Sequence, residues 1–113
     1  MNPEVKKLWV DVLRSGNYKQ SKLHLRDNDG YCCLGVLCEL AVQHKIIPSA
    51  NRWDSVYAYD GDIYALPDSV TFWAGLPNSD PRVVICGTSE ILSAHNDFGI
   101  TFEQIADAIE GQL

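Results

Sequence analysis

The chain has 113 residues, of which 46% are hydrophobic and 21% charged, as is ordinary for one globular domain with a single core. Its net charge of −6 argues against bulk nucleic-acid binding, and no apolar run approaches the roughly 20 residues needed to span a membrane. Residues Met1 to Glu4 lack the basic and then apolar pattern of a signal peptide, so we expect a cytosolic protein with reduced cysteines.

A first helix is predicted from Pro3 to about residue 15. Asn2 suits the capping position, Pro3 fits the first turn, and Gly16 suits a left-handed stop. One face carries apolar residues at helical spacing, namely Val5, Leu8, Trp9, Val12 and Leu13.

The segment from residue 17 to residue 30 is polar and less regular. Leu23 and Leu25 alternate with polar residues, which predicts a short, half-buried strand. Residues 27–30 read Asp-Asn-Asp-Gly, which predicts a turn.

A second helix is predicted from about Cys32 to His44, and it contains three of the four cysteines. Apolar residues occupy most of its circumference, so we expect it to lie at the centre of the fold. Gly35 would cost this helix about 1 kcal/mol relative to alanine, which indicates that another backbone segment or a ligand passes close to it.

Residues 55–65 predict a tyrosine-rich β-hairpin around the turn Asp60-Gly61, because Asp-Gly is a preferred two-residue turn and its flanks are aromatic or β-branched. A short helix is expected next, ending at Gly75. A core strand over residues 82–86 and a helical turn over residues 89–95 should follow.

The last helix begins at Thr101, which forms a capping box with Gln104, and it is expected to end at Gly111. The order of elements predicts one α+β domain over residues 1–113, with about four helices around a short antiparallel sheet that contains the hairpin.

The charges are unevenly distributed along the chain. Residues 1–52 carry eight basic and five acidic side chains, for a net charge of +3, whereas residues 53–113 carry one basic and ten acidic side chains, for a net charge of −9. We favour salt bridges between the two halves as the interpretation, over steering of a charged partner.

Four stretches resemble a family of small proteins encoded by bacteriophages and prophages. They are the run from Trp9 to Gln20, the run GYCCLGVLCELA over residues 30–41, the run from Leu66 to Leu76, and the run NDFGITFEQIADAIE over residues 96–110. The resemblance covers most of the chain and implies a viral origin and a bacterial cytosol. It supplies no activity.

The cysteine-rich helix suggests one enzymatic hypothesis. Cys32 or Cys33 near a helix N-terminus would have a lowered pKa and act as a nucleophile, with His95 as its base. Four other side chains are candidates for supporting roles: Asn96 and Asp97 for orienting the base, and His24 and His44 as alternative bases. Buried structural thiols are the interpretation that we favour, because reduced cysteine packs like a small apolar residue.

A metal site built from Cys32, Cys33, Cys38 and a histidine is less favoured. Cys33 and Cys38 point about 140° apart on an ideal helix, and the spacing contains no C-x-x-C pair. Asn96 and Asp97 most simply belong to a turn before the last helix, with binding of a ligand hydroxyl or a metal as the alternative.

The aromatic hairpin is the predicted binding surface. Tyrosine and tryptophan offer stacking faces with polar tips, and nearby basic residues would bind the phosphates of a nucleotide. The candidate ligand-binding residues are Tyr57, Tyr59, Tyr64, Trp53, Arg52, Lys19 and Arg26. The alternative is that the tyrosines cover the core.

The leading hypothesis is therefore a non-catalytic phage accessory protein that binds a host component, either a host protein or a small nucleotide signal, without a metal or cofactor. A homo-oligomer is compatible with so small a domain. The second hypothesis is a small cysteine-dependent hydrolase or transferase.

Overall fold

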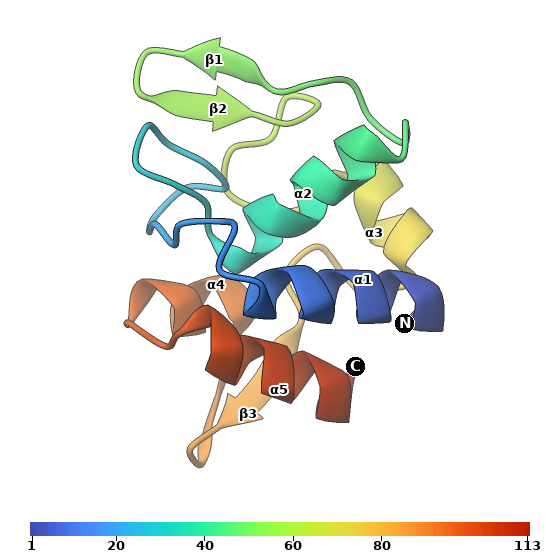
Figure 1. Cartoon of the computed structure of the whole chain (residues 1–113), viewed down its shortest axis with the longest axis vertical. Coiled ribbons are helices and arrows are strands. Elements are labelled where there is room, and N and C mark those ends of the chain that lie inside the picture. Colours follow the sequence, from blue (N-terminus) through green and yellow to red (C-terminus); the bar gives the residue numbers. More distant parts are fainter.

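The computed structural model describes residues 1–113, with five helices and two small antiparallel sheets (Figure 1). The predicted α+β class is confirmed, with five helices where about four were expected and two small antiparallel sheets where one was expected. The helices are α1 (Pro3–Arg14), α2 (Cys33–Gln43), α3 (Asp68–Ala74), α4 (Leu92–Asp97) and α5 (Phe102–Gln112). The strands are β1 (Asn51–Trp53), β2 (Val56–Ala58), β3 (Arg82–Ile85) and β4 (Thr88–Ile91).

One apolar core lies between the helices. Its 27 buried residues come from all five helices, from β3 and from the connecting loops, and none comes from β1 or β2. Figure 1 shows the β1–β2 hairpin and β3 at opposite ends of the long axis, with the helices between them. None of the helices combines the length and the apolar character needed to cross a membrane.

Helix α1 begins as the sequence predicts. The Asn2 side chain accepts hydrogen bonds from the backbone N–H groups of Glu4 and Val5, at 2.9 and 3.3 Å. Its apolar face packs against α2 and α5. At its other end Arg14 pairs with Asp107 and Glu110 of α5, which is the expected kind of salt bridge between the basic and the acidic half.

Helix α2 crosses the middle of the fold, and Gly35 is buried in its first turn. A Cβ atom at position 35 would overlap the backbone carbonyl oxygen of Leu25. The glycine is therefore explained by a neighbouring backbone segment, which is the first of the two explanations that its position suggested.

The strand predicted at Leu23 and Leu25 is wrong. Leu23 has φ +75°, in the left-handed region that a strand residue does not adopt, and its side chain is exposed. Leu25 is buried, and its N–H donates to the carbonyl of Ile63 at 2.8 Å. The turn predicted over residues 27–30 is confirmed, because the Asp27 carboxylate accepts the N–H groups of Asp29 and Gly30.

The predicted hairpin over residues 55–65 is also wrong. The strands that pair are β1 and β2, and Asp54 with φ +57° lies in the turn between them. Asp60 and Gly61 do form a turn, but only the single bridge between Tyr59 and Asp62 flanks it. The free edge of β2 pairs instead with the loop before α2, since the N–H of Tyr57 donates to the carbonyl of Arg26 at 3.0 Å.

The C-terminal third differs from the prediction at two places. Residues 88–91 form β4 with the partner strand β3, and only residues 92–97 are helical, as α4. The strand over residues 82–85 is buried on one face only. Helix α5 has the predicted capping box but continues through Gly111, because the Gln112 side chain bonds to both the N–H and the C=O of Val84.

Candidate binding pocket

A cavity of about 110 Å³ opens where the N-terminal end of α2 meets α4 and the loop after α1. Its wall comes from three parts of the chain, namely residues 23–32, the loop between β2 and α3, and α4. Its lining residues are Leu23, His24, Cys32, Tyr64, Ser93 and Asp97. It therefore brings together Cys32 and Tyr64, which the sequence assigned to two separate candidate sites.

The outer rim of the cavity is aromatic and apolar. The rings of His24 and Tyr64 are stacked, with centroids 5.5 Å apart and an interplanar angle of 27°. Leu23 is 68% exposed and Tyr64 is 62% exposed. The N–H of Leu23 donates to Asp97 Oδ1 at 2.9 Å, which helps to hold this residue in its left-handed conformation.

The inner end of the cavity is formed by the first turn of α2, whose N–H groups already have protein partners. Cys32 is the N-cap residue, and its Sγ accepts the N–H of Gly35 at 3.4 Å. Asn96 is fully buried, and its Oδ1 accepts the N–H of Cys33 at 3.2 Å. Because these donors are used internally, this helix end does not offer the usual site for an anion.

Two carboxylates, Asp97 and Asp80, give the cavity and its surroundings a negative charge. Asp97 Oδ1 accepts from Leu23 and from the Asn96 amide, whereas its Oδ2 has no hydrogen-bond partner. Behind Ser93, both oxygens of Asp80 accept hydrogen bonds from that residue's N–H and hydroxyl. Burial raises the pKa of Asp80, hydrogen bonds from Ser93 oppose that shift, and the charge of Asp97 adds to it.

The predicted lowering of the cysteine pKa values is wrong in direction. Burial raises the pKa of Cys32 to about 12, and it raises the pKa values of Cys33 and Cys38 well above their ordinary range. The hydrogen bonds that Cys32 receives at the helix end act in the opposite direction but are outweighed by the loss of solvation.

The predicted cysteine–histidine pair does not form. His95 is buried, and its Nε2 lies 2.9 Å from the carbonyl oxygen of Val83 on β3. Cys33 Sγ instead lies 3.7 Å from the carbonyl oxygen of Leu92. The histidine that lines the cavity together with Cys32 is His24, one of the two alternative bases.

We predict one reactive thiol in the native protein, the exposed Cys86. Alkylation of Cys32, Cys33 and Cys38 should be at least about 10³-fold slower, because these thiols are buried and their raised pKa values keep them protonated. Mass spectrometry of digests after timed alkylation measures each rate, and denatured protein is the control in which all four should react. Rapid native labelling of Cys32 at neutral pH would contradict this prediction.

Most of the predicted tyrosine surface is used inside the fold. The Arg26 guanidinium lies over the rings of Tyr31 and Tyr57, 4.8 and 4.0 Å from their centroids. Tyr59 is completely buried, and its hydroxyl donates to Glu39 of α2 at 2.7 Å. The Arg26 contact joins β2 to the loop before α2, and the Tyr59 hydrogen bond reaches α2 itself. Of the three predicted tyrosines, only Tyr59 covers the core, as the alternative interpretation expected.

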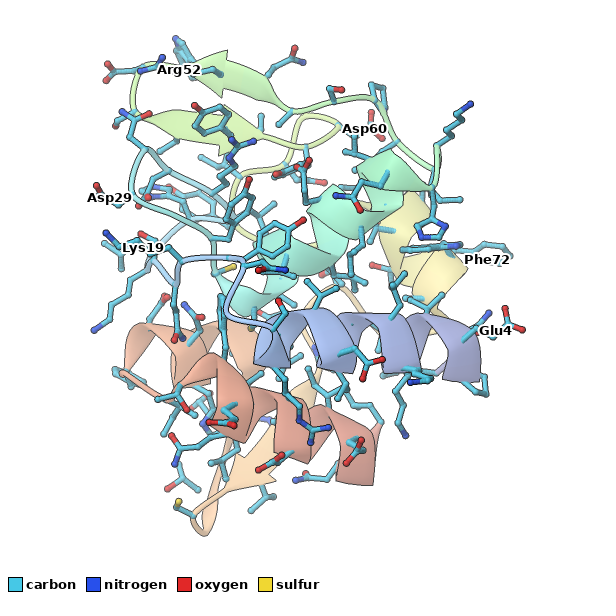
Figure 2. All side chains as sticks on the ribbon, viewed as in Figure 1. Glu4, Lys19, Asp29, Arg52, Asp60 and Phe72 are labelled. Atoms are coloured by element: carbon cyan, nitrogen blue, oxygen red, sulfur yellow. The ribbon has the colours of Figure 1, made fainter.

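The remaining predicted ligand residues are exposed but spread out. Trp53 is 79% exposed at the end of β1. Arg52 and Lys19 reach solvent, and Figure 2 shows Asp29 between them in that view. Sequence reasoning missed Leu23 and Ser93 as lining residues, and no local signal marks them, because the loop conformation and the packing of α4 place them there.

A family model described as Domain of unknown function (DUF8296) matches the chain over residues 1–113. No curated protein and no solved structure matches it.

Proposed function

We propose that this chain, which belongs to the DUF8296 family, is a non-catalytic phage accessory protein that binds a host protein in the bacterial cytosol. The viral and cytosolic parts rest on the resemblance of the runs over residues 30–41 and 96–110 to phage and prophage proteins. The binding part rests on the rim of the cavity at the N-terminal end of α2.

The exposed Leu23 carries this proposal. A left-handed backbone costs an ordinary residue about 1–2 kcal/mol, and here that conformation holds a large apolar side chain in water. Tyr64 is exposed on the same rim. Tyr64 is of a residue type that is enriched in protein-binding hot spots, and Leu23 adds exposed apolar surface beside it on the same rim.

The thiols support a non-catalytic role. Burial raises the pKa of Cys32 to about 12, which keeps it a thiol at neutral pH, and no histidine hydrogen-bonds to it. A nucleotide ligand has less support than a protein, because Arg26 and Tyr57 stack on each other and Tyr59 is buried.

Site-specific photo-crosslinking tests the proposal. A benzophenone-bearing phenylalanine replaces Tyr64 in one variant and Phe72 in another, and both are expressed in host cells. Phe72 is the matched control, because it is an 88% exposed aromatic residue that projects from α3 (Figure 2). We expect discrete adducts from position 64 that position 72 does not give. No adduct from position 64, or the same adducts from both positions, would contradict a partner at this rim.

A further inference from the structure

The negative charge of the cavity determines whether a cationic or an anionic group can bind in it. Asp97 lines the cavity, Asp80 lies directly behind Ser93, and no lysine or arginine is among the lining residues. In the first turn of α2, the N–H of Cys33 is taken by Asn96 Oδ1 and the N–H of Gly35 by Cys32 Sγ, which leaves fewer donors for an anion. A cationic group therefore fits and an anionic one does not.

The acceptor pattern distinguishes between the cationic side chains. Asp97 Oδ1 already accepts two hydrogen bonds, so only Oδ2 is free. The Ser93 hydroxyl donates to Asp80 and retains lone pairs that can accept. A guanidinium prefers both oxygens of one carboxylate, whereas an ammonium group is a compact charge whose three donors can use separate single acceptors. The site therefore suits lysine better than arginine.

The walls and the size of the cavity fit the rest of a lysine side chain. The Tyr64 ring offers an aromatic surface to a cation, the His24 ring stacks on Tyr64 and holds it in place, and Leu23 offers apolar surface to a methylene stem. A volume of about 110 Å³ holds one such side chain and not a larger ligand such as a nucleotide. A lysine belonging to a protein would also bring a surface that covers the exposed Leu23 and Tyr64.

Building on the proposed function, we propose that the host partner inserts a lysine side chain between Leu23 and Tyr64, with its ammonium group bound by Asp97 Oδ2 and the Ser93 hydroxyl.

NMR titration of the isotope-labelled full chain tests this without the partner. The probes are Nα-acetyl-lysine N-methylamide, the corresponding norleucine compound, which has the same stem without the charge, and the corresponding arginine compound. We expect the lysine probe to shift the amides of Leu23, Cys32 and Asp97 with a Kd of about 1–10 mM, and the other two to bind at least about fivefold more weakly.

Two variants localise the effect. Asp97→Asn keeps the Oδ1 that holds Leu23, and it should weaken lysine binding at least about tenfold. Asp29→Asn is the matched control, because Asp29 is exposed in a turn, and its binding should equal that of the wild type.

Absent shifts with the lysine probe up to about 50 mM would overturn the inference, as would equal binding of norleucine. If the lysine probe fails while crosslinking from position 64 persists, the inference is wrong and the proposed function stands. If crosslinking fails while the lysine probe binds at Asp97, the cavity is an ammonium site and the proposed protein partner is wrong.

Discussion

Replacing Gly35 with alanine is expected to destabilise the protein by at least about 3 kcal/mol, which is a large effect for one methyl group. The new Cβ would overlap the carbonyl oxygen of Leu25, which accepts the N–H of Cys32 and therefore cannot move aside freely. The backbone must separate where the loop between α1 and α2 (residues 15–32, the pocket loop) packs against α2. Urea unfolding followed by circular dichroism measures the loss.

Gly111 provides the matched control within another helix. A Cβ at position 111 in α5 meets no atom within 4 Å, so alanine there should be neutral or should stabilise the protein by up to about 1 kcal/mol. Equal unfolding midpoints for Gly35→Ala and the wild type would show that the Leu25 backbone does not pack against α2 as described.

Replacing Asn96 with alanine is expected to cost about 3–4 kcal/mol of unfolding free energy. Its Oδ1 accepts from Cys33 N–H and from Gln20 Nε2, at 3.2 and 2.9 Å, and its Nδ2 donates to the carbonyl of Ser21 at 2.8 Å. The alanine variant leaves the buried N–H of Cys33 and the carbonyl of Ser21 without these partners, while Gln20 Nε2 keeps only its bond to the carbonyl of Ile100, and it opens a cavity between α4 and α2.

Asn28→Ala is the control for this prediction, because Asn28 is exposed in the turn before α2, and its loss should cost no more than about 0.5 kcal/mol. Asn96→Asp should also destabilise the protein, since aspartate retains the acceptor but cannot donate to Ser21 and places a second charge beside Asp97. If Asn96→Ala unfolds at the same urea concentration as Asn28→Ala, the hydrogen bonds of the Asn96 side chain do not stabilise the fold.

The parts of the fold that the sequence predicted correctly depend on near neighbours. Asn2 caps α1 and Thr101 caps α5 through atoms two or three residues away, so their signals survive in any tertiary context. The turn at Asp60-Gly61 is correct for the same reason.

The predictions that are wrong concern segments whose hydrogen-bond partners lie far away in the sequence. The hairpin predicted around Asp60 fails because Tyr59 is drawn to Glu39 on α2, and Arg26 in the pocket loop already pairs with the edge of β2. Nothing within residues 55–65 reveals either partner. The strand at Leu23 fails because Asp97, 74 residues away, holds its N–H.

Part of the candidate site could be predicted from the sequence, because Cys32, His24, Tyr64 and Asp97 were all candidate residues. Cys32 could be placed at a helix end, but its pKa is set by burial under segments that the helix pattern does not contain. The sequence predicts His95 as the base that activates the cysteine, but on α4 this side chain points toward β3. Asn96 and Asp97, on another side of the same helix, face the start of α2. Helical phase could be assigned only once residues 88–91 were known to be a strand.

The most direct test uses the host protein that the crosslinking identifies. Isothermal titration calorimetry of the purified, free host protein measures its affinity for the wild type, for Leu23→Ala and for Phe72→Ala. The account predicts that Leu23→Ala weakens binding at least about tenfold relative to the wild type, because Leu23 is the exposed anchor of the rim. Phe72→Ala, which removes an even more exposed apolar side chain on α3, should bind within about twofold of the wild type. Unchanged affinity for Leu23→Ala, or a larger loss for Phe72→Ala, would contradict the assignment of this pocket as the binding site.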